Sequence, residues 1–157
     1  MAFKRSGTHL AIPHHIQQEI IAHCRSKLPK EACGLLAGDR LVEVPNPPRE
    51  VTHVYLYPMT NVEDSPIGYA MDPKEQLLVE KQMRQRDQRL LGVYHSHTAS
   101  DAYPSSVDVS LAVSPDISYV LVSLKDWARP VVKSYRLDGS RVIPEEAVIE
   151  DGPCGTI

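Results

Sequence analysis

The sequence lacks any long apolar run, since no stretch approaches the roughly 18 apolar residues that a membrane-spanning helix needs. It also lacks the basic and then apolar pattern of a signal peptide at its beginning. The formal net charge of −3 offers no electrostatic basis for binding nucleic acid or an anionic lipid surface. We therefore expect a cytoplasmic protein whose partners are neither nucleic acids nor membranes.

Cysteine is scarce as well: Cys24, Cys33 and Cys154 are widely spaced, with no Cys-x-x-Cys pair among them. This pattern predicts neither a disulfide framework nor a separate zinc ribbon. We expect Cys24 and Cys33 to be small buried residues with structural roles. Cys154 belongs to residues 151–157, which we expect to form a flexible tail.

The chain also contains no internal repeat, linker or low-complexity segment. Its 157 residues, of which 42% are hydrophobic and 24% are charged, are enough to bury a normal core. We therefore expect a single domain over residues 1–150. Its oligomeric state is left open by the sequence.

A first helix is predicted between Pro13 and Pro29, because apolar residues recur there at helical spacing. These residues are Ile16, Ile20, Ile21, Cys24 and Leu28. Three histidines, His14, His15 and His23, lie on or near this helix. We expect them to be solvated or at its rim, and not to bind a metal.

A second helix is predicted to begin after Asp72, whose side chain can cap it, with Pro73 in its first turn. We expect this helix to extend to about Arg89. Its inward side chains are predicted to be Leu77, Leu78 and Met83.

Short apolar runs bounded by turn residues predict several strands. They cover residues 9–12, 31–38, 41–44, 51–57, 90–94, 118–124, 131–136 and 141–143. Residues 58–70, between the candidate site segments, are expected to form a loop bordering a substrate groove. Helices interleaved with strands indicate an α/β or α+β domain.

The strand predicted for residues 90–94 leads directly into two histidines, His95 and His97, at spacing i, i+2. On an extended strand these side chains point to the same face, so they can converge on one ion. Imidazole nitrogen suits zinc, and a catalytic zinc site takes three protein ligands and leaves one position open. Asp108 is the best nearby candidate for the third ligand.

Each of these features also has a plainer interpretation. A His-x-His pair can lie at a surface without a metal, and Ser105-x-x-Asp108 matches a helix capping box. The capped helix would cover residues 107–114, before Pro115. A capped helix start can also hold Asp108 rigidly toward the histidines, so the two interpretations are compatible.

The pattern His95-x-His97, seven residues, and then Ser105-x-x-Asp108 resembles the signature of the JAMM (MPN+) metalloprotease family. The upstream stretch Glu31-Ala32-Cys33-Gly34-Leu35-Leu36 resembles that family's Glu-x-Cys-Gly-Leu-Leu stretch. One difference is Thr98, where many members have proline. The resemblance implies a curved, mixed β-sheet packed by helices, with a deaminase-like architecture and the metal at the sheet's edge.

The resemblance also implies a role for each matching residue. Zn²⁺ would be bound by His95, His97 and Asp108, and would lower the pKa of a bound water toward about 7. Glu31 would be the general base, taking a proton from that water and returning it to the leaving amine. Ser105 would stabilise the oxyanion that forms on the attacked carbonyl.

Family members cleave peptide or isopeptide bonds, commonly after the glycine tail of ubiquitin-like proteins. This chain resembles the compact, single-domain prokaryotic type, which implies ubiquitin-like sulfur-carrier proteins as substrates. Two alternatives remain: a protein-binding scaffold of the metal-free MPN type, and a zinc deaminase. The deaminase signature, His-x-Glu with Pro-Cys-x-x-Cys, is absent from the sequence.

Overall fold

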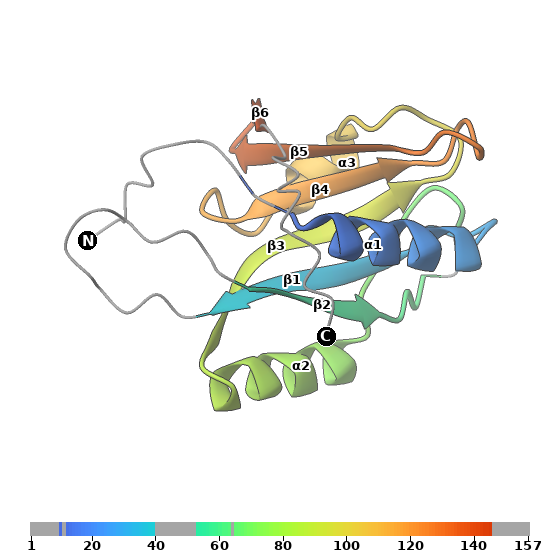
Figure 1. Ribbon diagram of the computed structural model, residues 1–157. Coiled ribbons are helices and arrows are strands. Elements are labelled where there is room, and N and C mark those ends of the chain that lie inside the picture. Colours follow the sequence, from blue (N-terminus) through green and yellow to red (C-terminus); the bar gives the residue numbers. More distant parts are fainter. Residues whose placement is uncertain (1–9, 11, 40–52, 64, 146–157) are drawn as a thin grey trace.

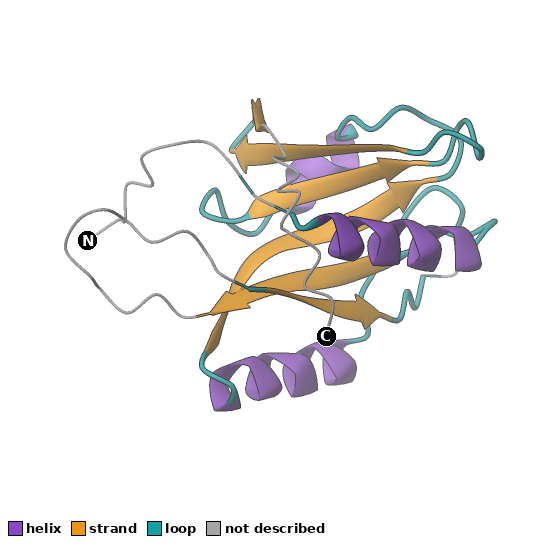
Figure 2. Cartoon of the chain, viewed as in Figure 1, coloured by secondary structure: helices purple, strands orange, loops and turns teal. Residues whose placement is uncertain are grey.

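The computed structural model describes residues 10, 12–39, 53–63 and 65–145, which build one six-stranded sheet and three helices (Figures 1 and 2). In chain order the elements are α1 (His14–Ser26), β1 (Cys33–Asp39), β2 (Val54–Met59), α2 (Pro73–Gln85), β3 (Gln88–His97), α3 (Ser106–Leu111), β4 (Ser118–Ser123), β5 (Val131–Asp138) and β6 (Arg141–Glu145). The predicted α+β class is confirmed. No helix among these residues is both long enough and apolar enough to cross a membrane.

The sheet is mixed, with strand order β2-β1-β3-β4-β5-β6. Neighbouring strands are antiparallel except for β3 and β4, which are parallel and are connected through α3. A parallel pair needs a crossover connection of this kind, whereas antiparallel neighbours can be joined by short turns. The carboxyl end of β3 therefore leads directly into the segment that carries α3.

Helices cover both faces of the sheet. Alternate side chains of β4 divide between two cores: Val120 and Val122 pack with α1, while Tyr119 and Leu121 belong to the opposite face. Figure 1 shows α1 in front of the sheet and α3 behind it. The buried residues of α2 pack with β1 and β2 on the face opposite α1. The sheet is thus the middle layer between helices.

Glycine at position 34 is required by the close approach of β1 and β3. A Cβ atom at this position would overlap the ring of Tyr94, which is fully buried. The Tyr94 hydroxyl is also 2.7 Å from His23 Nδ1 on α1. His23 is half-buried, which agrees with the expected position at the rim of the helix, and it joins α1 to β3.

The prediction for the second helix was wrong in two respects. It ends at Gln85, because Asp87 adopts a positive φ of 53° and β3 begins at Gln88. Its buried side chains are Val79 and Met83, whereas Leu77 and Leu78 are exposed. The helix contacts the sheet through the narrow stripe that Val79 and Met83 form, and packing against the sheet determines which residues form it.

The remaining predicted elements have mixed outcomes. Pro58, at the start of the predicted loop 58–70, lies within β2, where an edge strand tolerates proline. Leu10 and Ile12 are buried core residues without strand pairing, so the first predicted strand is not found at the described positions. The strand predicted for residues 41–44 and the flexible tail at 151–157 lie outside the described residues.

Candidate active site

The strand β3 brings His95 and His97 to one face at its carboxyl end. Both histidines are buried, with residue exposures of 3% and 6%. The resemblance implied a metal at the sheet's edge, but β3 is an interior strand with β1 on one side and β4 on the other. The site therefore lies at the carboxyl end of a central strand, where the chain leaves β3 for α3.

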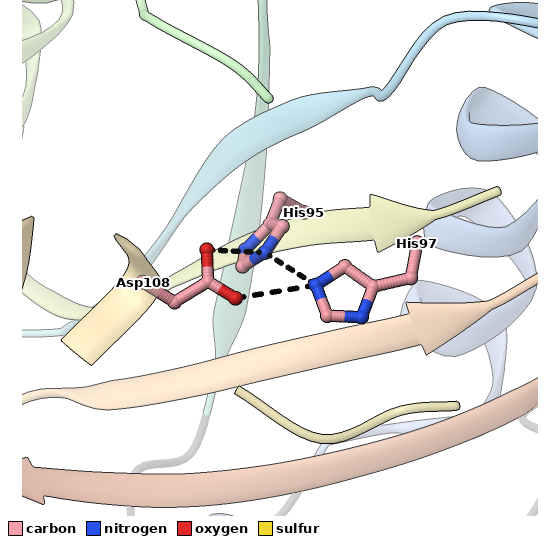
Figure 3. Close-up of side chains that lie close together, drawn as sticks. All are labelled: His95, His97 and Asp108. Carbon is pink, nitrogen blue, oxygen red and sulfur yellow. Dashed lines mark hydrogen bonds and ion pairs between the residues drawn. The ribbon is translucent and has the colours of Figure 1, made fainter. Parts of the chain in front are cut away.

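Asp108 on α3 completes a compact group with the two histidines (Figure 3). His95 Nε2 is 3.2 Å from Asp108 Oδ1, and His97 Nε2 is 3.2 Å from Asp108 Oδ2. The two Nε2 atoms are also 3.2 Å apart. All three side chains thus offer a donor atom to one point, and these atoms lie within 4.8 Å of one another.

The capping box predicted for Ser105 and Asp108 is present. The Asp108 N–H donates to Ser105 Oγ at 3.1 Å, and the Ser105 N–H donates to Asp108 Oδ2 at 2.8 Å. This reciprocal pair fixes the first turn of α3 and directs the Asp108 carboxylate toward the histidines. The helix is shorter than predicted and ends at Leu111.

The tautomer of His97 follows from its second nitrogen. His97 Nδ1 lies 2.8 Å from the carbonyl oxygen of Asp101, which can only accept a hydrogen bond. A proton therefore resides on Nδ1, so that in the neutral ring the lone pair of Nε2 is available to a metal. Backbone support of this kind is typical of histidines that bind metals.

Tyr69 is a site residue that sequence reasoning missed. Its ring stacks on His95 with the ring centroids 4.6 Å apart and the planes tilted by 31°. Burial raises the pKa of the Tyr69 hydroxyl, with smaller contributions from Asp108 and Glu31. Because Tyr69 lies in a loop without periodicity, no pattern in the sequence pointed to it.

Glu31 lies just before β1 and is buried, with 6% of its surface exposed. Burial raises the pKa of its carboxyl to about 7; the charge of His97 opposes this shift, and that of Asp108 adds to it. The Glu31 N–H donates to the Ser65 carbonyl at 3.3 Å, so the loop after β2 lies against this residue. A carboxyl that titrates near neutral pH can both accept and release a proton.

The electrostatics of the group favour an ionised aspartate. Burial raises the pKa of Asp108, but hydrogen bonds from His95 and His97 outweigh it and hold the pKa well below its ordinary value. Burial lowers the pKa of His95. Burial also acts to lower the pKa of His97, but hydrogen bonds to Asp108 and to the Asp101 carbonyl outweigh it, so the pKa of His97 is raised. Two imidazole nitrogens and one carboxylate form a donor set that suits zinc with an open coordination position.

Comparisons with known proteins agree with this geometry. A family model described as prokaryotic homologs of the JAB domain matches residues 13–138. The chain is 44% identical over 140 residues to a CysO-cysteine peptidase of Mycobacterium tuberculosis, covering 88% of this chain and 89% of that protein. It is 30% identical over 123 residues to a desampylase of Haloferax volcanii, covering 75% of this chain and 83% of that one.

A solved structure is similar along most of the chain. The solution structure of a Desulfitobacterium hafniense protein has a TM-score of 0.74 and 39% identity, covering 89% of this chain and 92% of that one. The relatives named above are a peptidase and a desampylase, which confirms the predicted enzyme class, a JAMM-type hydrolase. This chain belongs to the prokaryotic homologs of the JAB domain.

Proposed function

We propose that this chain is a zinc-dependent peptidase that hydrolyses the bond after the C-terminal glycine of a ubiquitin-like sulfur-carrier protein. The leaving group we favour is cysteine, because the relative that is 44% identical is named a CysO-cysteine peptidase. The observation that carries the proposal is the convergence of His95, His97 and Asp108 next to a buried glutamate.

His95 Nε2, His97 Nε2 and the Asp108 carboxylate would bind the zinc ion. When bound, zinc supplies a Lewis acid that makes water acidic near neutral pH. Hydrogen bonds within the chain orient two of these side chains. The Asp101 carbonyl fixes the tautomer of His97, and the capping box fixes the orientation of Asp108. Tyr69 covers one side of the His95 ring.

Glu31 is the proposed general base. The attacking water gives a proton to the Glu31 carboxylate while its oxygen bonds to the carbonyl carbon of the terminal glycine. The carbon–nitrogen bond then breaks, and the proton held by Glu31 passes to the leaving amino group. The second proton of the water also leaves the new carboxyl group, so the products are a carboxylate on the carrier protein and a protonated amine, and no oxidant or further reactant is required.

Ser105 is the proposed donor to the oxyanion. Its hydroxyl oxygen accepts the Asp108 N–H, which occupies a lone pair but leaves the hydroxyl proton available. Ser105 is exposed, so a substrate carbonyl can approach it. The same side chain can therefore cap α3 and donate to the reacting oxygen.

The test is hydrolysis of a sulfur-carrier protein that carries cysteine on its C-terminal glycine, followed by intact-mass spectrometry. We expect loss of the cysteine with the zinc-loaded protein, and no loss after chelation until zinc is restored. Glu31→Gln should lower the rate by about 10²–10⁴ while retaining zinc. Glutamine keeps the size of glutamate but cannot accept the proton.

Two outcomes would contradict the proposal. Equal cleavage by wild type and Glu31→Gln would remove Glu31 as the base. Tight binding of the carrier protein without cleavage by either form would indicate a scaffold. A second substrate, the same carrier joined to a lysine side chain of another protein, separates cysteine release from isopeptide cleavage.

A further inference from the structure

Ser96 lies between the two proposed ligands in the sequence but faces away from them. Alternate residues of a strand point to opposite faces, and its neighbour Tyr94 packs in the core beneath α1. Ser96 is fully buried, with 0% exposure. Its hydroxyl therefore cannot touch a substrate bound at His95 and His97.

The Ser96 hydroxyl contacts Cys24 on α1 and also the residue that follows Glu31. The Ala32 N–H donates to Ser96 Oγ at 2.8 Å, across 64 residues of sequence. The Ser96 N–H in turn donates to the Ala32 carbonyl at 3.0 Å. Here the serine side chain takes the place of the backbone acceptor that an antiparallel pair would ordinarily supply.

The same peptide group is held from its other side by Asn61. The carbonyl of the Glu31–Ala32 peptide accepts a hydrogen bond from Asn61 Nδ2 at 3.0 Å. Asn61 is itself fixed by its loop, since its Oδ1 accepts the N–H groups of Glu63 and Ala70, each at 3.0 Å. The Glu31–Ala32 peptide is thus hydrogen-bonded by two side chains: Asn61 binds its carbonyl and Ser96 binds its N–H.

These two hydrogen bonds are important because the Glu31–Ala32 peptide lies outside the regular pairing of β1 with β3. The pairing between β1 and β3 begins at Cys33 and His95, one residue further along β1. Without side-chain partners, the plane of the Glu31–Ala32 peptide would be set only by its neighbours. Rotation of that plane moves the Glu31 carboxylate relative to His95 and His97.

We propose that Asn61 and Ser96 are positioning residues that clamp the Glu31–Ala32 peptide from its two sides and thereby set the Glu31 carboxylate against the metal ligands. The inference rests on the proposed function, in which Glu31 is the base. A shift of about 1 Å in a reacting group can cost about 10²-fold in rate. Neither side chain takes part in the reaction itself.

The experiment is a double-mutant cycle with the cysteine-bearing carrier protein as substrate. We expect Ser96→Ala to lower kcat by about 10- to 100-fold, with KM and zinc content unchanged, and Ser96→Thr to restore kcat because it keeps the hydroxyl. In the Glu31→Gln background, Ser96→Ala should cost less than about threefold, since residues that act as a unit are not additive.

The matched control is Ser118→Ala on β4. Ser118 is also a fully buried serine, but its hydroxyl has no hydrogen-bond partner within the described part of the chain. This variant removes the same atom from the same sheet without touching Glu31. It should keep the wild-type kcat.

An equal loss of kcat from Ser96→Ala with and without Glu31→Gln would overturn the inference, as would a wild-type kcat for Ser96→Ala. The same cycle is measured with Asn61→Ala, so the inference is decided even if Ser96→Ala does not fold. Wild-type cleavage by Glu31→Gln would instead overturn the proposed function. The two failures are therefore distinguishable.

Discussion

Ser105 and Asp108 hold each other through two reciprocal hydrogen bonds, and the Asp108 oxygen that accepts the Ser105 N–H is also 3.2 Å from His97 Nε2. A helix cap and a candidate metal ligand are therefore the same carboxylate. The geometry of the site depends on a local feature of α3 as well as on the sheet. Substitutions at this cap should consequently affect both stability and chemistry.

Ser105→Ala should lower turnover by about 10²–10³ through loss of the proposed oxyanion donor. It should also lower the free energy of unfolding by about 1 kcal/mol through loss of the cap. Turnover and urea unfolding are measured on the same preparation, with Ser105→Thr as the control that retains both roles. Unchanged turnover with lowered stability would leave Ser105 as a cap only.

Metal removal should destabilise the protein, because a ligand that binds only the folded state stabilises it. Elemental analysis should find about one zinc per chain. A free zinc concentration 100-fold above Kd raises the free energy of unfolding by about 2.7 kcal/mol. This should raise the Tm of the zinc-free protein by roughly 5–10 °C.

Two histidine variants test which residues are responsible for this shift in Tm. His97→Ala should abolish it, whereas His14→Ala, at an exposed histidine outside the cluster, should retain it. An undiminished shift in His97→Ala would exclude His97 as a ligand.

Glu31→Gln should stabilise the zinc-free protein above neutral pH. The pKa of Glu31 is raised by burial from 4.5 to about 7, so below about 4.5 the carboxyl is protonated in both states and imposes no penalty. Between these values the unfolded chain ionises first, and the folded state loses stability as pH rises. The loss of stability is complete above about pH 7 and amounts to about 3 kcal/mol.

The measurement is the difference in unfolding free energy between Glu31→Gln and wild type in excess chelator. This difference should grow from about pH 4.5 to about pH 7 and then stay constant. Taking the difference removes contributions that both proteins share, including titration of the histidines. A difference in unfolding free energy that is independent of pH would show that ionisation of Glu31 does not destabilise the folded state.

Gly34→Ala should destabilise the protein by about 1–3 kcal/mol, because the added methyl overlaps the ring of Tyr94. Tyr94→Leu in the same chain should relieve part of this cost, giving a double variant more stable than the sum predicts. Gly68→Ala is the control, since its Cβ would meet only the flexible Glu63 carboxylate. Equal losses from the two glycine substitutions would remove the steric explanation.

Local patterns predicted a large part of the structure. The spacing of His95 and His97 placed them on one face, and Ser105-x-x-Asp108 predicted the cap, because both depend on the geometry of a few consecutive residues. Packing decided other features. Leu77 and Leu78 fit an inward stripe as well as Val79 does in sequence, but the contact with the sheet selects Val79.

The spacing of the two histidines, the cap and the burial of Cys24 and Cys33 could be predicted from the sequence alone, since each depends on a few consecutive residues. Which distant groups meet depends instead on the order and register of the strands in the sheet. The sheet order places β1 beside β3, so that Glu31 lies near His97 and Ala32 is hydrogen-bonded to Ser96. The loop after β2 adds Asn61, which donates to the Glu31 carbonyl, and Tyr69, which stacks on His95. Such contacts join residues far apart in the chain, and no local pattern encodes the register that creates them.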